Sequence, residues 1–210
     1  MSWKTWEEIP GGFRRRAYQT EEEYQEKQAQ KLDSKLGWCR RVDKDCYEKL
    51  LMVLQRYDIG KPGMSVLCLG ARLGGEVRAF QAMGCFTIGI DLNPGADNTL
   101  VLHGDFHHIQ FADGSVDIAF TNCLDHVREL AQLLSEVKRV LKPDGIFYME
   151  SKAGYANQPG GRMSDHWDCF EWETIEALQG AIEKEGFQLT MRYLERKQRA
   201  HPHGLVFKKR

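Results

Sequence analysis

The stretch that decides the fold reads Ser65-Val66-Leu67-Cys68-Leu69-Gly70-Ala71-Arg72-Leu73-Gly74-Gly75-Glu76, and further along comes Thr87-Ile88-Gly89-Ile90-Asp91. Each apolar run is short enough for a buried strand, and the glycines after the first run predict a turn into a helix. Glycine lets main-chain N–H groups approach a ligand at the N-terminus of that helix. A carboxylate after the second strand, here Asp91, can accept both hydroxyls of a ribose. The pattern therefore indicates a strand–turn–helix–strand unit that holds a nucleoside.

The composition limits the class of protein. With 210 residues, 42% of them hydrophobic, the chain fits one α/β domain with a terminal extension. Its formal net charge of -1 gives no general attraction to polyanions, so we do not expect a nucleic-acid partner. The sequence has no apolar run of about 18 residues, which predicts no membrane span. The N-terminal residues also lack the apolar core of a signal peptide.

The cysteine pattern points to a reducing compartment. No two of the six cysteines have the Cys-x-x-Cys spacing, so we expect neither a disulfide framework nor a zinc site. Together with the N-terminus, this predicts a cytoplasmic protein with reduced thiols. Three histidines near Asp105 (His103, His107 and His108) resemble a metal cluster by number only, and we expect them in solvent or at the edge of a bound base, with no metal.

The chain divides into an N-terminal extension, residues 1–63, and a nucleoside-binding domain, residues 64–210. Within the extension, Thr20 followed by three glutamates predicts a helix that ends near Leu36. Asp43 is expected to cap a second helix, which ends at Asp58-Ile59-Gly60. These two helices are predicted to form a lid, with Trp38, Arg40 and Arg41 at their junction.

From residue 64 on, strand and helix patterns alternate, which predicts a mostly parallel sheet covered on both faces. We expect a three-layer α/β/α, doubly wound architecture. The predicted strands are 66–69, 86–90, 99–102, 116–120, 145–150, 187–194 and 205–207, and the predicted helices are 76–83, 127–141 and 172–185.

Three further segments sharpen the nucleoside prediction. Gly104-Asp105-Phe106 places a carboxylate and an aromatic ring at the carboxyl edge of the sheet, which suits the amine and the face of a purine. The strand over 116–120 continues into Thr121-Asn122-Cys123-Leu124-Asp125-His126. An amphipathic helix then ends in Leu141-Lys142-Pro143-Asp144-Gly145, a turn into the next strand.

In this order and spacing, the segments resemble the class I S-adenosylmethionine-dependent methyltransferases over roughly residues 45–195. The resemblance implies a seven-stranded sheet with an antiparallel edge strand and a cofactor across the carboxyl ends of its strands. By position it assigns Gly70, Ala71 and Gly74 to the methionine moiety, Asp91 to the ribose, Asp105 and Phe106 to adenine, and Asn122 to the floor beside the sulfonium. Leu92 and Cys123, which directly follow Asp91 and Asn122, complete the cofactor-binding candidates together with Arg72.

The chain departs from the family pattern at two positions. The family usually has an acid at the position of Cys68 and a second glycine at that of Arg72. Loss of the acid removes a partner for the ammonium group of the cofactor, which the carbonyl of Gly70 or Asn122 would have to replace. Arg72 adds a cation that could bind the carboxylate of the cofactor or an anionic acceptor.

Catalytic candidates lie just beyond the strand over 116–120. His126 is the best candidate for a general base, because imidazole titrates near neutrality. A histidine at a helix N-terminus with no proton to move is the alternative. Asp125 could orient His126 or cap the helix that follows, and capping is favoured.

A later loop holds His166 and Trp167, which could bind a sugar or another polar ring as the acceptor. Alternatively, Trp167 and Trp172 fasten the following helix to the sheet.

The sequence thus predicts methyl transfer from S-adenosylmethionine to an oxygen or nitrogen of a small-molecule or glycan-like acceptor. A nicotinamide-dependent oxidoreductase is the alternative enzyme, although Arg72 stands where that fold needs a glycine. A partner-binding module without catalysis, on the same fold, is the remaining alternative.

Overall fold

The computed structural model describes residues 5–18, 20–157, 167–195 and 203–210. Its main sheet has seven strands in the order β5-β4-β3-β6-β7-β10-β9. These strands are β3 (Ser65–Leu69), β4 (Phe86–Asp91), β5 (Val101–His103), β6 (Val116–Thr121), β7 (Leu141–Ser151), β9 (Phe187–Leu194) and β10 (His203–Lys209). The first five strands of the order pair in parallel, and β10 runs antiparallel between β7 and β9. The predicted doubly wound, mostly parallel sheet is confirmed.

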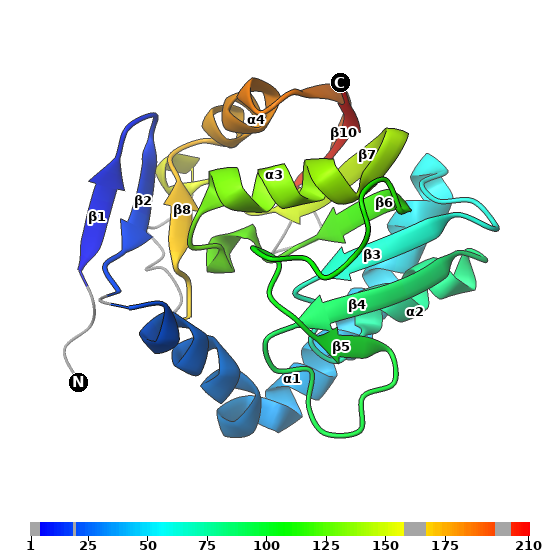
Figure 1. Cartoon of the computed structure of the whole chain (residues 1–210), viewed down its shortest axis with the longest axis horizontal. Coiled ribbons are helices and arrows are strands. Elements are labelled where there is room, and N and C mark those ends of the chain that lie inside the picture. The colour runs from blue at the N-terminus through cyan, green and yellow to red at the C-terminus, as the bar shows by residue number, and fades with distance from the viewer. Residues whose placement is uncertain (1–4, 19, 158–166, 196–202) are drawn as a thin grey trace.

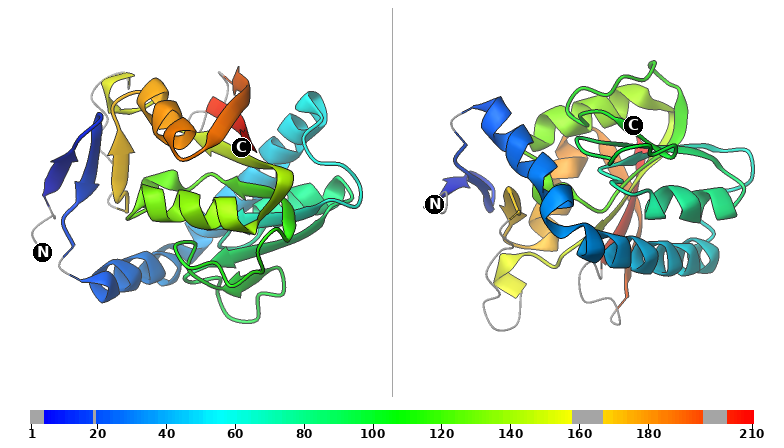
Figure 2. Two further views of the ribbon diagram at one scale, coloured as in Figure 1. Left: turned by 45° about the horizontal axis from the view of Figure 1, so that its top comes forward. Right: turned by 90° about the horizontal axis from the view of Figure 1, so that it is seen from below.

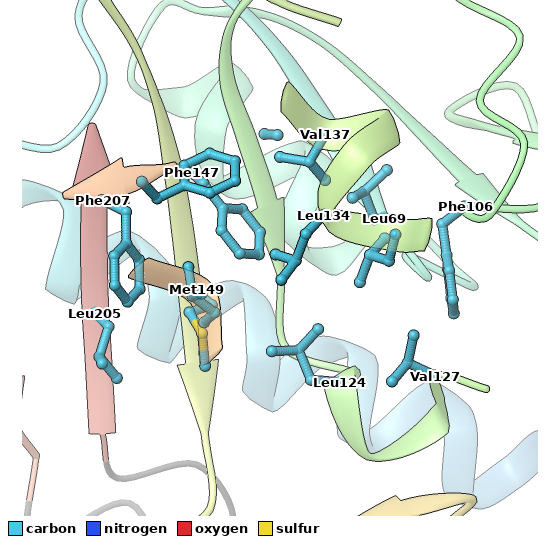
Figure 3. Close-up of a cluster of buried hydrophobic side chains, with 14 of the residues drawn as sticks. Leu69, Phe106, Leu124, Val127, Leu134, Val137, Phe147, Met149, Leu205 and Phe207 are labelled. Atoms are coloured by element: carbon cyan, nitrogen blue, oxygen red, sulfur yellow. The ribbon is translucent and has the colours of Figure 1, made fainter. Parts of the chain in front are cut away.

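Two helical layers cover the sheet because the strand residues alternate between its faces (Figure 2). On β3, Leu67 and Leu69 join the apolar cluster under α3 (Leu130–Val140) and α4 (Ile175–Lys184). Figure 3 shows part of this cluster, with Leu134 and Val137 of α3 and Leu69 and Phe147 of the strands among the labelled side chains. Val66 and Cys68 point to the other face, against α1 (Glu21–Tyr57) and α2 (Gly75–Ala82). Burial on both faces explains why the strands read as continuous apolar runs.

The N-terminal extension contains one long helix rather than the two predicted. Thr20 caps α1 as expected, since its Oγ1 accepts a hydrogen bond of 3.2 Å from the Glu23 N–H. The helix kinks at Lys35 but continues to Tyr57. Asp43 starts no new helix, because its carboxylate instead pairs with the Arg78 guanidinium of α2 at 2.5 Å. The predicted junction at Trp38, Arg40 and Arg41 therefore lies inside a continuous helix.

A second, three-stranded sheet was not predicted. It consists of β1 (Trp6–Ile9), β2 (Phe13–Arg16) and β8 (Phe170–Trp172), all antiparallel. The predicted helix over 172–185 was too long at its start, because Trp172 belongs to β8 and Thr174 caps α4 by accepting from the Ala177 N–H at 3.1 Å. In Figure 1 the arrowheads of β3, β4 and β6 point toward the side of the molecule where this small sheet lies.

The segment after β6 also differs from the prediction. A short 3-10 helix, η1 (Leu124–His126), comes before α3, which begins only at Leu130. Another 3-10 turn, η2 (Tyr155–Asn157), follows β7. All six cysteines are free thiols. Within the described ranges, none of the helices has the length and apolarity needed to cross a membrane.

Candidate functional site

The glycine turn between β3 and α2 forms the first part of the site. Gly70 has a φ of 71°, and its N–H donates to the Ile90 carbonyl at 2.8 Å. A Cβ at this position would lie 2.2 Å from the Cys123 sulfur, so both the backbone and the packing require glycine. Gly74, with a φ of 90°, is the N-cap residue of α2. The structure thus brings together the predicted residues Gly70, Gly74 and Cys123.

Asp91 lies beside this turn, at the carboxyl end of β4. Its Oδ2 accepts from the Arg72 N–H at 3.0 Å, and its Oδ1 accepts from the Asn93 N–H at 2.8 Å, across Leu92. The Arg72 guanidinium Nε lies 4.0 Å from the same Oδ2. Arg72 therefore lies on the Asp91 side of the turn, where the ribose is predicted, and this position does not favour contact with the carboxylate of the cofactor.

Asp105 and Phe106 follow β5 and reach the same edge. The Asp105 Oδ1 accepts from the His107 N–H at 2.8 Å and lies 2.9 Å from the His107 Nδ1. Burial alone would raise the pKa of Asp105, but the hydrogen bonds from His107 bring it below its usual value. Phe106 is buried and lies against the glycine turn, since its ring would be 3.7 Å from a Cβ at Gly70.

The expectation for His107 was wrong. Its side chain is buried, and its Nε2 accepts from the N–H groups of Arg128 and Glu129 at 3.3 Å each. His107 thus joins the loop after β5 to the start of α3, rather than lying in solvent or at the edge of a base.

Asn122 connects three elements at the end of β6. Its Nδ2 donates to the Glu76 Oε1 at 2.9 Å and to the Cys46 sulfur at 3.3 Å. Glu76 lies in the first turn of α2 and Cys46 on α1. We did not select Glu76 from the sequence, although its position directly after Gly74-Gly75 was a usable signal.

The two catalytic candidates, Asp125 and His126, lie in η1, directly after β6. The His126 Nδ1 lies 2.9 Å from the Trp167 carbonyl. Because a carbonyl can only accept, Nδ1 carries the proton and Nε2 is the basic nitrogen of the neutral ring. This Nε2 lies 3.9 Å from the Asp125 Oδ1.

Asp125 does not cap α3, which corrects the favoured prediction. Its Oδ2 instead lies 2.5 Å from the Lys152 ammonium, which also binds the Asp168 Oδ2 at 2.9 Å. Burial would lower the pKa of Lys152, but the two carboxylates raise it above its usual range.

Ligand atoms of Asp125, His126 and Asp168 lie within 4.8 Å of one another, as in a metal site. The Lys152 ammonium, however, binds both acids and takes the place that a metal ion would have between them. Lys152 was not predicted, since both its partners are distant in sequence.

Of the two residues predicted to bind the acceptor, His166 and Trp167, the structure describes Trp167. His166 lies outside the described residues. Trp167 is buried, and its carbonyl accepts from the Gln28 Nε2 at 3.1 Å as well as from His126. The Trp167 carbonyl therefore joins α1 to η1, whereas the structural alternative expected Trp167 to fasten the following helix to the sheet. Its contact with an acceptor stays a prediction.

Helix α1 lies over this whole edge of the sheet. Its first half binds η1 through the Tyr24 hydroxyl, which donates to the His126 carbonyl at 2.8 Å. Its second half packs on α2, where a Cβ at Gly75 would lie 2.4 Å from the Asp43 carbonyl. Figure 2 shows α1 running from the side of the β1–β2 hairpin to α2. The segment predicted to form a lid is thus one kinked helix, and its covering of a cofactor stays a prediction.

Comparisons with known proteins identify methyltransferases as similar to this chain. A family model described as "Methyltransferase domain" matches residues 67–149. Sterol 24-C-methyltransferase ERG6B of Gibberella zeae is 29% identical, over 53% of this chain and 36% of its own length. Phosphoethanolamine N-methyltransferase 2 of Caenorhabditis elegans is also 29% identical, over 53% of this chain and 29% of its own. The chain thus spans about a third of the length of the curated relatives it matches.

The fold has a solved counterpart over nearly its whole length. The 1,6-didemethyltoxoflavin-N1-methyltransferase of Burkholderia thailandensis, solved with S-adenosylhomocysteine, has a TM-score of 0.71 and 18% identity, covering 97% of this chain and 98% of that one. At this identity the likeness concerns the fold alone. The methyltransferase domain matched over residues 67–149 and the seven-stranded, mostly parallel sheet are what the resemblance to the class I S-adenosylmethionine-dependent methyltransferases implies.

Proposed function

We propose that this protein transfers the methyl group of S-adenosylmethionine to an oxygen or nitrogen of a small-molecule or glycan-like acceptor. The observation that carries the proposal is the position of Asp91 beside the glycine turn. Two main-chain N–H groups, of Arg72 and Asn93, hold one oxygen each of its carboxylate. A carboxylate fixed in this way at the end of the second parallel strand suits the two hydroxyls of a ribose.

The residues present fit the cofactor along the edge of the sheet. The turn at Gly70–Gly74 has no side chain at the two positions where the main chain would approach the methionine moiety. Asp105 is ionised at neutral pH and can accept from the adenine amine. When bound, S-adenosylmethionine supplies a methyl group already activated on a sulfonium, so the protein mainly has to align the acceptor.

His126 is the residue that we propose as the general base. The hydrogen bond from its Nδ1 to the Trp167 carbonyl fixes the ring and leaves Nε2 as the proton acceptor. A base at this position would take the proton from an acceptor hydroxyl as the methyl group arrives, or from an acceptor ammonium before it arrives, which typically contributes ~10²–10⁴-fold. Asp125, held by Lys152, would act as a positioning residue for His126.

Small acceptors agree with what the relatives act on by name. The curated relatives are named for a sterol and for phosphoethanolamine, and the solved neighbour holds 1,6-didemethyltoxoflavin. Helix α1 binds both η1 and α2, so an acceptor must fit between these elements and the sheet. Such enclosure favours a small molecule, or one sugar of a glycan, over a folded macromolecule.

The proposal is tested with S-adenosylmethionine that carries an isotopic label on its methyl group. Purified protein and a small-molecule extract of the host are incubated with it, and mass spectrometry then identifies the labelled product. A labelled small molecule that is absent with the Asp91→Ala variant supports the proposal. Calorimetry with S-adenosylmethionine and with a nicotinamide dinucleotide tests the alternatives: binding of the dinucleotide alone would favour the oxidoreductase. Cofactor binding without label on any acceptor would favour the partner-binding module.

A further inference from the structure

We propose that Glu76 binds the ammonium group of the cofactor's methionine moiety and so replaces the acid that the family has at the position of Cys68. The inference rests on S-adenosylmethionine as the cofactor and does not depend on the acceptor. It assigns to a residue of α2 a contact that the sequence pattern places on β3.

The position of Glu76 is the first argument. The residue follows Gly74-Gly75 directly and lies in the first turn of α2, at the end of the glycine turn. The hydrogen bond from the Asn122 Nδ2 to the Glu76 Oε1 connects it to the end of β6. Its carboxylate therefore lies between the two segments that the family fold uses for the methionine moiety.

The partners of Glu76 are the second argument. Its carboxylate is buried, with 9% of the residue exposed. Among the described residues, the side chains that hydrogen-bond it are neutral, namely Asn122 and the Cys46 thiol, which donates to Oε1 at 3.2 Å. Both of these bonds end on Oε1, and neither partner brings a positive charge. Desolvation raises the pKa of Glu76, as expected for a carboxylate that lacks a cation. A buried carboxylate is stabilised most by a cation that arrives with hydrogen-bond donors, as an ammonium does.

The third argument is that Glu76 is a neighbour of Cys68. Burial raises the pKa of the Cys68 thiol, and the nearby Glu76 charge raises it further. Cys68 is completely buried on the face of β3 that packs against α1 and α2. The negative charge that is missing from β3 is thus supplied from α2, which packs on the face of β3 where Cys68 lies.

Helix α1 completes the site by covering this carboxylate. The Asp43 carbonyl lies so close to Gly75 that no Cβ would fit, and Cys46 follows one turn later. The helix thus separates Glu76 from solvent, which strengthens its attraction to a bound ammonium.

The experiment compares two ligands that differ only in the ammonium group. They are S-adenosylhomocysteine and its analogue with hydrogen in place of the α-amino group, each titrated calorimetrically into the wild-type protein and into Glu76→Gln. The wild type is expected to bind S-adenosylhomocysteine at least about tenfold more tightly than the analogue, and Glu76→Gln to bind both within about twofold. Glu136→Gln is the control, because the Glu136 carboxylate lies on α3, where Arg139 and the Ile109 N–H bind it. It should keep the wild-type ratio.

Three outcomes of these titrations would decide against the proposal. An unchanged ratio in Glu76→Gln would mean that Glu76 only supports the fold. If the variant loses affinity for S-adenosylmethionine but not for S-adenosylhomocysteine, the carboxylate serves the sulfonium instead. If neither ligand binds the wild type, the cofactor assignment itself fails, and the proposed function with it. Should Glu76→Gln not fold, as judged by circular dichroism, Glu76→Asp keeps the charge but withdraws it by one methylene, and its ratio should fall between one and that of the wild type.

Discussion

The Arg72 N–H donates a hydrogen bond of 3.0 Å to the Oδ2 of Asp91, and this bond joins the glycine turn to the end of β4. The Asn93 N–H binds the other oxygen at 2.8 Å. A carboxylate that is fixed from both sides loses little further freedom when it binds a ligand. The two segments that predicted the fold therefore also form one preorganised unit of the site.

Asp91→Ala is expected to weaken the binding of S-adenosylhomocysteine at least about tenfold, since it removes both oxygens that we propose as acceptors for the ribose hydroxyls. Isothermal titration calorimetry measures the effect. Asp45→Ala is the control, because Asp45 is an exposed residue of α1 that pairs only loosely with Lys49, at 3.8 Å. Equal affinity of the Asp91 variant and the wild type would remove Asp91 from the site.

Arg72→Gly is expected to stabilise the protein by up to about 1 kcal/mol, because Arg72 has a φ of 39°, which costs an L-residue about that much. The gain is limited by the greater freedom of glycine in the unfolded chain. Urea unfolding measures the free energy. Asp97→Gly isolates the backbone contribution, since Asp97 is exposed and has a φ of 57°. A loss of stability in Arg72→Gly alone would show that the guanidinium contact with Asp91 outweighs the strain.

The strands of the main sheet could be predicted because each carries a local signal. Phe86–Asp91, for example, is an apolar run that begins after a glycine and ends on a carboxylate, and the predicted bounds were one residue short. Buried parallel strands can be predicted from such apolar runs, and the polar residues that follow them mark where the strands end.

What the sequence did not predict depends on contacts between distant residues. Asp43 looks like a helix cap, but Arg78 of α2 binds its carboxylate, so α1 continues through it. The β1–β2 hairpin gains its third strand only from β8, more than 150 residues further on. Lys152 has no local signal at all, because its role comes from Asp125 on η1 and from Asp168.

His126→Gln is expected to lower kcat by about 10²–10⁴-fold if the acceptor must lose a proton in the methyl-transfer step. Cofactor affinity should remain within about twofold, since we propose that His126 contacts the acceptor and not the cofactor. Single-turnover kinetics with the labelled cofactor separates the two effects. An unchanged rate would mean that the acceptor arrives already deprotonated and that His126 is structural. Recovery of the rate at higher pH in the variant would support its role as the base.

Glu150 is expected to make the stability of the protein fall between about pH 4 and pH 7. Desolvation raises its pKa to about 7, although the hydroxyls of Tyr148 and Tyr193 partly oppose the shift. In the unfolded chain its pKa is about 4.3, so between these values the folded state holds a proton that the unfolded state has lost. The stabilisation by this proton is complete below about pH 4 and is lost as the pH rises through 7, with a total on the order of 3 kcal/mol.

Glu150→Gln removes this titration, because glutamine stays neutral and still offers an oxygen to the two tyrosines. Relative to the wild type, the variant should become more stable as the pH rises from 5 to about 8. Urea unfolding at several pH values measures the difference. Glu136→Gln is the control with the opposite sign: hydrogen bonds from Arg139 lower the pKa of Glu136, so that its contribution is lost as the pH falls. Parallel pH profiles for Glu150→Gln and the wild type would show that the Glu150 carboxyl group titrates near its ordinary value, and that the tyrosine hydroxyls fully offset its burial.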